Sequence, residues 1–174
     1  KFNSITPYSQ EIKHLLNNAL NSPRKFIKNK KEYNYLSSLI TKQHAEVVEK
    51  LINWSNITPS VIGFHGQTIF HDPKGKKSYQ LGDGPLLSKI LKLNIVYDFR
   101  SNDLKFGGQG APIAPIYHQK ILENLRIKLP STIINIGGIT NITYWDGKNL
   151  FGFDCGPGNN LMDYSMRKFF NKDY

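Results

Sequence analysis

The sequence has a single cysteine, so no disulfide can form within its 174 residues. Freedom from disulfides fits a reducing compartment. No apolar run approaches the roughly 18 residues that a membrane-spanning helix needs, and the first residues show no secretory signal pattern. We therefore expect a cytoplasmic protein that does not bind a membrane.

Several common motifs are also missing. The sequence contains no phosphate loop ending in Gly-Lys-Ser/Thr and no Gly-x-Gly-x-x-Gly fingerprint, so it does not support those nucleotide-binding folds. His65 and His71 are six residues apart with no cysteine nearby, which matches no common zinc spacing, and no metal site is expected. Cys155 has no histidine near it in the sequence, and we interpret it as a small buried residue.

The charge of the chain is strongly one-sided, with 23 basic and 13 acidic residues and a formal net charge of +10. Such a balance is typical of proteins that bind nucleic acids or anionic ligands. The lysines, however, are scattered among asparagines and isoleucines rather than gathered in one stripe. We therefore expect no nucleic-acid partner.

The pattern of apolar residues predicts a mixed α/β protein. With 39% hydrophobic and 12% aromatic residues, the chain can bury a core. Residues 1–32 predict one helix, and apolar residues at helical spacing predict a longer one over about 33–54. Strands and short helices alternate from residue 61 onward. A run of three strands and a final helix after Pro130 suggests a domain change near residues 125–130.

Gly137 and Gly138 lie between two predicted strands. Glycines at such a turn let backbone N–H groups approach a phosphate, and Thr140 or Asn141 can add polar contacts. The alternative is a hairpin turn that needs glycine only for a positive φ.

Asp154 is expected at the end of a buried strand, directly before Gly156-Pro157-Gly158-Asn159 and a helix. The start of a helix suits a phosphate, and an aspartate at a strand end can act as a base on a bound hydroxyl or water. The alternative is that Asp154 caps the turn or the helix.

Two polar clusters lie earlier in the chain. His65 to Thr68 follow a predicted strand and offer enough groups to bind several sugar hydroxyls, although a tight turn with a satisfied histidine gives the same pattern. Arg100 lies close in the sequence to Asp98 and Asp103. One interpretation is that its guanidinium binds a carboxylate or the oxygens of a sugar. The alternative is that the three residues form a salt-bridge cluster on the surface.

The motifs of this chain, and the order in which they occur, resemble those of the anhydro-N-acetylmuramic acid kinases. These enzymes are a family of the sugar kinase/actin/heat-shock-chaperone ATPase superfamily. The resemblance covers about residues 60–165. The matching segments are GFHGQTIFHDP (63–73), YQLGDGPLL (79–87), DFRSND (98–103), GGQGAPIAP (107–115), INIGGITNIT (134–143) and GFDCGPGNNLMD (152–163).

The resemblance implies an α/β, two-lobed actin-like ATPase (ribonuclease H-like) fold. Residues 1–127 would be the remainder of the first lobe, and residues 128–174 the start of the second. The implied reaction uses ATP and Mg²⁺ to open the 1,6-anhydro bridge of the amino sugar with water and to phosphorylate O6. The resemblance also allows the intact enzyme to form a homodimer.

The resemblance also implies roles for individual residues. Asp154 would be the general base that activates water. The sugar would be bound by His65, Gln67, Thr68, Asp98 and Arg100. The nucleotide phosphates would be faced by Gly137, Gly138, Asn141, Gly156, Gly158 and Asn159.

Two parts of the family pattern are missing. The family begins with a loop of the form G-x-x-S-G-T-S-x-D-G-x-D, which residues 1–58 do not contain, and its adenosine-binding part is expected beyond residue 174. We therefore interpret the chain as an incomplete kinase and expect no turnover by it alone. The alternatives are a non-catalytic remnant of a split gene that keeps sugar binding, and another actin-like ATPase module.

Overall fold

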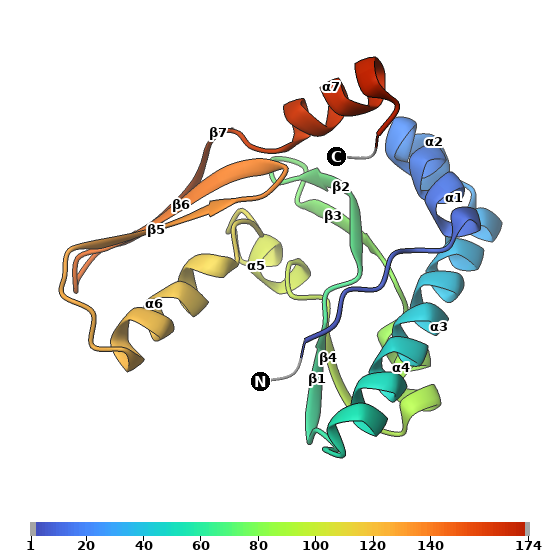
Figure 1. Ribbon diagram of the computed structural model, residues 1–174, viewed down its shortest axis with the longest axis horizontal. Coiled ribbons are helices and arrows are strands. Elements are labelled where there is room, and N and C mark those ends of the chain that lie inside the picture. The colour runs from blue at the N-terminus through green and yellow to red at the C-terminus, as the bar shows by residue number, and fades with distance from the viewer. Residues whose placement is uncertain (1–2, 173–174) are drawn as a thin grey trace. The chain divides into compact units, whose positions relative to one another are not determined.

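The computed structural model describes residues 3–172 (Figure 1). The chain divides into two compact units, Lys1–Gly110 and Ala111–Tyr174, which are described separately below.

The first unit begins with three helices, α1 (Gln10–Asn21), α2 (Pro23–Lys28) and α3 (Lys30–Ser55). Two helices thus form where the sequence analysis expected one. Pro23 lies in the first turn of α2 and explains the break, because proline has no N–H to continue a preceding helix and restricts the residue before it. The longer helix is confirmed, and it begins a few residues earlier than expected.

Two small sheets follow. The first pairs β1 (Val61–Phe64) in parallel with β4 (Asn94–Tyr97). The second is an antiparallel hairpin of β2 (Gln67–Asp72) and β3 (Lys77–Leu81).

Two short helices complete the first unit. Helix α4 (Gly84–Leu91) begins where the carboxylate of Asp83 accepts the N–H of Leu86, 2.8 Å away. Helix α5 (Ser101–Lys105) was not predicted, and at five residues it is too short to show a helical period.

Helix α3 packs across the β2–β3 hairpin through the main core of the first unit. Leu36 and Ile40 of α3 are fully buried there with Leu81 of β3. Other members of this core come from α1, α2 and β2: Ile12, Ala19, Phe26, Ile27 and Ile69. The position of the hairpin therefore depends on α3.

One face of α3 also holds the backbone at the end of the hairpin. Tyr33, Ser37 and Thr41 recur every four residues and so share one face of the helix. Their hydroxyls bond the segment 80–83: Tyr33 donates to the carbonyl of residue 80, while Ser37 and Thr41 accept the N–H groups of residues 82 and 83. We call these three side chains the hydroxyl ladder.

The second unit contains α6 (Ala114–Asn124) and three antiparallel strands in the order β5 (Ser131–Ile136), β6 (Ile139–Trp145) and β7 (Leu150–Pro157). Helix α7 (Asn160–Phe170) follows.

Asp146 and Gly147 lie in the hairpin turn between β6 and β7, a place that this residue pair favours. The Asp146 carboxylate accepts the N–H groups of Lys148 and Asn149, and Gly147 has a φ of 96°. These bonds, chiefly the one from the Asn149 N–H, lower the pKa of Asp146.

Helix α6 packs on β6 and β7, and His118 of α6 bonds the buried Thr143 hydroxyl at 2.7 Å. The compact units therefore divide 17 residues before the expected boundary between residues 127 and 128. The assignment of the two segments to kinase lobes stays a prediction.

Two expectations about burial in the second unit are wrong. The strand that leads to Asp154 was expected to be buried, but Phe151 and Phe153 in it are each more than half exposed. Cys155, interpreted as a buried residue, is exposed. The exposed side chains of Ile134, Phe151 and Phe153 alternate along the strands with the residues that face α6.

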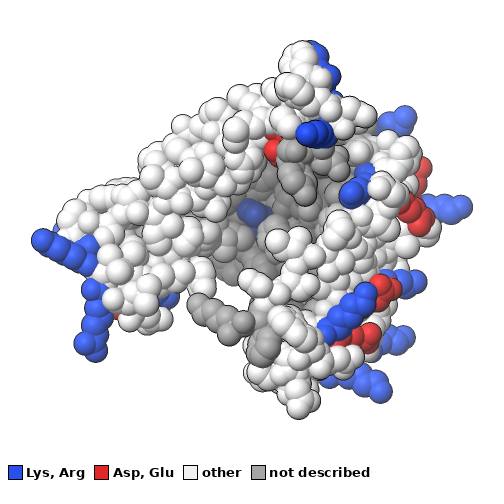
Figure 2. All heavy atoms as spheres, viewed as in Figure 1, with Lys and Arg blue, Asp and Glu red and all other residues white. Residues whose placement is uncertain are grey.

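The basic side chains in Figure 2 do not form one continuous patch, and several of them lie beside acidic side chains. Within residues 3–172, none of the helices combines the length and the apolar character required to cross a membrane.

We expect Leu36→Ala to destabilise the first unit by about 2–5 kcal/mol, because it removes a fully buried side chain and leaves a cavity. Urea denaturation followed by circular dichroism measures the loss. Leu20→Ala is the matched control, since Leu20 is 46% exposed. An equal effect of the two changes would contradict the assigned core.

Candidate functional site

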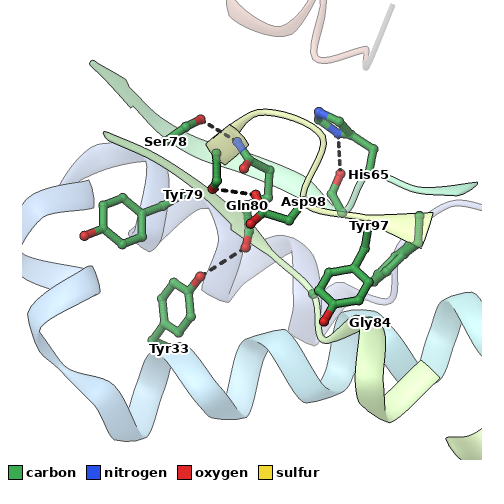
Figure 3. Close-up of a pocket in the computed structure, with 12 residues that line it drawn as sticks. Tyr33, His65, Ser78, Tyr79, Gln80, Gly84, Tyr97 and Asp98 are labelled. Atoms are coloured by element: carbon green, nitrogen blue, oxygen red, sulfur yellow. Dashed lines mark hydrogen bonds between the residues drawn. The ribbon is translucent and has the colours of Figure 1, made fainter. Parts of the chain in front are cut away.

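A pocket of about 240 Å³ opens in the first unit between α3, the β2–β3 hairpin and the ends of β1 and β4 (Figure 3). Its lining combines aromatic rings with polar groups. The residues that line it are Tyr33, Phe64, His65, Gly66, Ser78, Tyr79, Gln80, Gly82, Gly84, Tyr97, Asp98 and Ser101.

Gln80 is held from both ends in this pocket, as Figure 3 shows. Its carbonyl accepts the Tyr33 hydroxyl at 3.0 Å. Its side-chain amide donates to the hydroxyls of Ser78 and Thr68, at 2.7 and 3.2 Å. Burial, and secondarily the nearby Tyr79, raises the pKa of Tyr33, so its phenol stays a neutral donor.

One wall of the pocket depends on a glycine. A Cβ on Gly84 would lie 2.3 Å from the Tyr97 ring, so no larger residue allows this ring to lie where it does. Tyr97 is 48% exposed and stays open to a ligand.

His65 and Arg100 meet at the edge of the pocket. Nδ1 of His65 lies 3.0 Å from the Gly66 carbonyl, which can only accept. The proton therefore belongs on Nδ1, and Nε2 accepts from Arg100 at 3.0 and 3.2 Å. The ring is held in one tautomer with one orientation.

Arg100 and Asp103 also fix Gly110, the last residue of the first unit. Arg100 donates to the Gly110 carbonyl and the Asp103 carboxylate accepts the Gly110 N–H, both at 2.7 Å. Partial burial lowers the pKa of Arg100, although arginine remains charged. Among residues 3–172 neither Asp98 nor Asp103 forms an ion pair with Arg100, so the salt-bridge alternative is wrong.

The predicted sugar-binding residues are close to this pocket but not all in its lining. His65 and Asp98 line it, and Thr68 and Arg100 are each one hydrogen bond behind a lining residue. Gln67 is next to Thr68 and donates to its carbonyl. Whether a sugar binds here stays a prediction.

The sequence analysis did not assign Tyr33, Gln80 or Tyr97 to the site. Gln80 belongs to the YQLGDGPLL segment that carried the family resemblance, and Tyr97 directly precedes Asp98. Tyr33 had no signal, because only the packing of α3 brings it to residue 80.

In the second unit, the two predicted phosphate-facing loops are bonded to each other. The N–H of Asn159 donates to the Gly137 carbonyl at 2.7 Å, and those of Gly158 and Asn160 donate to the Gly138 carbonyl at 3.0 and 3.3 Å. These amides are therefore occupied. The N–H groups of Leu161 and Met162, in the first turn of α7, have no helical partner and remain for a ligand.

Close approach explains the glycines of these two loops. Neither Gly137 nor Gly138 has a positive φ, so that alternative is wrong. A Cβ on Gly158 would lie 2.1 Å from the Gly137 carbonyl oxygen, and one on Gly138 would lie 2.5 Å from the Asn160 side chain.

The strand register aligns three polar residues across the sheet. Asn135 pairs with Asn141, and Asn141 pairs with Asp154, so all three belong to one face. The pairing slips directly after this row, leaving Cys155 as the extra residue of a β-bulge. Bulges often re-aim side chains next to functional sites.

Asp154 lies within β7 rather than at the end of a strand. It is exposed, and among the described residues its carboxylate accepts no hydrogen bond. It caps neither a turn nor α7, so the capping alternative is wrong. An exposed, unpaired carboxylate can accept a proton from bound water.

We expect Gly110→Ala to reduce the free energy of unfolding by about 2–4 kcal/mol, because Gly110 has a φ of 66° and a Cβ there would lie 2.9 Å from buried Leu104. Thermal or urea unfolding measures the loss. Gly107→Ala is the control, since Gly107 also has a positive φ but open space around it. If both changes cost the same, close packing at Gly110 is not the constraint.

The family model for anhydro-N-acetylmuramic acid kinase matches residues 2–174. Curated proteins with the same name are similar to this chain. The protein of Pelagibacter ubique (strain HTCC1062) is 44% identical over 162 residues, which cover 91% of this chain and 43% of the relative. That of Bradyrhizobium diazoefficiens is 35% identical over 175 residues, covering 97% and 48%, and that of Hydrogenovibrio crunogenus is 37% identical over 171 residues, covering 97% and 45%.

The chain spans less than half the length of these relatives. The match nevertheless runs over both units, and it confirms the resemblance drawn from the motifs together with the mixed α/β, actin-like ATPase fold class. The chain belongs to the anhydro-N-acetylmuramic acid kinase family.

Proposed function

We propose that this chain carries the sugar-binding site and the catalytic base of an ATP-dependent kinase that opens 1,6-anhydro-N-acetylmuramic acid and phosphorylates its O6. The observation that carries the proposal is the family match over both units, from residue 2 to residue 174. Motif residues of the first unit gather at one pocket, and those of the second unit gather at one end of a sheet.

The pocket of the first unit has the chemistry that a sugar ring requires. Its volume of about 240 Å³ is near the lower end of small-molecule sites, which begin at about 300 Å³. Tyr97 offers an apolar face, while Asp98 and Gln80 offer polar atoms. Hydrogen-bond partners already fix Gln80 and His65, so little order is lost when a sugar binds.

Asp154 is the proposed general base. Its carboxylate removes a proton from a water molecule, whose oxygen bonds to C1 of the sugar as the C1–O6 bond breaks. The freed O6 then bonds to the γ-phosphorus of ATP as the bond from that phosphorus to the bridging oxygen breaks and ADP leaves. Asn135 and Asn141 lie beside Asp154 in the strand register and carry donors that can orient this water.

ATP supplies the phosphoryl group, and Mg²⁺ would neutralise charge on it. The donors that fit a phosphate are the free N–H groups of Leu161 and Met162 and the side chain of Asn141. The expected contacts from the amides of Gly158 and Asn159 are not proposed, because these amides bond the Gly137-Gly138 turn. Within residues 3–172, no group of three or more His, Cys, Asp or Glu side chains could hold a metal ion.

The length of the chain favours a narrower activity for the 174 residues alone. They span less than half of the relatives, so we propose that they bind the sugar without turning it over. Calorimetry with the anhydro sugar, beside an ATP-dependent phosphorylation assay, tests this. Turnover by the chain alone, or no sugar binding at millimolar concentration, would overturn the proposal.

We expect His65→Ala to weaken sugar binding at least about tenfold, because it removes a side chain that lines the pocket and leaves Arg100 without its partner. Calorimetric titration measures the change. His71→Ala is the matched control: His71 lies in β2, close in the sequence to His65, and bonds Ser78, but it does not line the pocket. Equal weakening by both changes would remove His65 from the site.

We expect Asp154→Asn to lower kcat by about 10²–10⁴-fold with little change in KM, because the amide cannot accept a proton from water. The assay uses a chimera in which this chain replaces the aligned region of the Pelagibacter ubique relative. Asp146→Asn is the control, since Asp146 is a carboxylate of the same sheet that serves a turn. An active Asp154→Asn chimera would exclude Asp154 as the base.

A further inference from the structure

A second pocket of the first unit, of about 360 Å³, opens between α2 and the β2–β3 hairpin. Three basic side chains, one carboxylate and two aromatic rings give it its character: Arg24, Lys28, Lys77, Asp72, Phe70 and Tyr79. We call these six residues and the space between them the basic groove. Tyr79 also lines the candidate sugar pocket, but the three basic residues belong to none of the segments that carry the family resemblance.

Two elements bring the lining residues together from opposite sides. The two basic residues of α2 are four positions apart and so share one face of that helix. In the hairpin, Phe70 pairs with Tyr79 and Asp72 pairs with Lys77. Because side chains alternate along a strand, these two pairs lie on the same face of the hairpin. Helix α2 contacts β2, so its basic face and this face of the hairpin enclose the groove.

The three basic side chains of the groove have no acidic partners. Among residues 3–172 the one ion pair lies in α6 of the second unit, so Arg24, Lys28 and Lys77 form none. Like charges four residues apart on a helix repel each other, and α2 contains no acidic residue that could offset the repulsion between Arg24 and Lys28. An anion bound between them would offset it and would add charge-assisted hydrogen bonds.

Arg24 is held in place by an aromatic ring. Its guanidinium carbon lies 5.6 Å from the centroid of the Phe70 ring, a cation–π contact. Phe70 in turn packs against the main core of the first unit. Within the described part of the chain, none of the guanidinium N–H groups donates a hydrogen bond. The donors of Arg24 are therefore positioned before a ligand arrives, and they remain available to it.

Asp72 favours a ligand that carries hydroxyl groups beside its anionic group. Its Oδ1 accepts the N–H of Gly75 in the hairpin turn, at 3.0 Å. Its Oδ2 accepts no hydrogen bond from the described residues. A carboxylate oxygen repels a phosphate oxygen but accepts a hydroxyl. The ring of Tyr79, across the groove, offers an apolar surface of the kind that lines small-molecule sites.

We propose that the basic groove binds a hexose phosphate, with the phosphate between the three basic side chains and a sugar hydroxyl on Asp72. A phosphate monoester carries a charge of about −1.5 to −2 and three strong acceptor oxygens, which suits three unpaired cations. The groove volume of about 360 Å³ lies within the range of small-molecule sites, which begins at about 300 Å³.

A nucleotide fits the groove less well. The rings of Phe70 and Tyr79 are 6.2 Å apart and inclined at 55° to each other, so they cannot hold a flat base between parallel faces. Arg24 lies over one face of the Phe70 ring and makes that face less accessible for stacking. A base would therefore gain little here, whereas the hydroxyls of a hexose have Asp72 to bind.

Calorimetric titration of the 174-residue chain with glucose 6-phosphate tests the proposal, with inorganic phosphate and adenosine monophosphate as comparisons. We expect glucose 6-phosphate to bind at least about tenfold more tightly than either, and added salt to weaken it. Inorganic phosphate has no hydroxyl-bearing ring for Asp72 and Tyr79. Three results would overturn the proposal: no binding at millimolar concentration, equal binding of inorganic phosphate, or tighter binding of adenosine monophosphate.

Lys28→Ala and Lys77→Ala should each weaken the binding of glucose 6-phosphate about tenfold, because each removes a charged donor to the phosphate. Lys25→Ala and Lys74→Ala are the matched controls: they lie on the same helix and in the same hairpin, and each removes one positive charge, but neither residue lines the groove. All four side chains are exposed, so circular dichroism should show every variant folded.

Equal weakening by the groove variants and their controls would indicate general attraction to a chain of net charge +10 and would contradict the assigned site. These titrations use neither the anhydro sugar nor ATP. The proposed kinase function and the proposed hexose phosphate site can therefore fail separately.

Discussion

The geometry of the first unit depends on the hydroxyl ladder of α3. Tyr33, Ser37 and Thr41 lie every four residues on one face of the helix and bond the backbone of residues 80–83. The N–H groups of Gly82 and Asp83 lie beyond the end of β3, where the strand ladder cannot pair them, and Ser37 and Thr41 supply the acceptors that they need. The ladder therefore fixes both the end of the hairpin and the wall of the pocket.

Two separate sets of hydrogen bonds hold the polar residues of the pocket. Gln80 is held by Tyr33 and Ser78, and His65 is held by Gly66 and Arg100. The same guanidinium holds Gly110, after which the second unit begins. A ligand that contacts His65 would thus touch the hydrogen-bond partner of Arg100, and Arg100 also fixes the end of the first unit.

The glycines of the second unit have a structural role, and they lie next to the residues of the candidate site. The glycines of the 137–138 turn and the 156–159 loop allow two backbone segments to bond each other at close range. This contact fixes the end of the sheet at which the register aligns Asn135, Asn141 and Asp154. It also occupies the amides of Gly158 and Asn159, two residues that the sequence predicted to face a phosphate.

The sequence by itself determined the fold class, most helices and strands, and the family, because periodicity, turn residues and linked motifs are local properties of the chain. It found His65, Asp98 and Asp154 as candidates for the same reason. Only the tertiary structure decided that Tyr33 reaches residue 80, that Arg100 serves Gly110, and that Asp154 lies within a strand beside two asparagines. It also decided that Cys155 and one face of the sheet are exposed. These features depend on packing and on strand register between residues far apart in the chain, and no local pattern encodes such contacts.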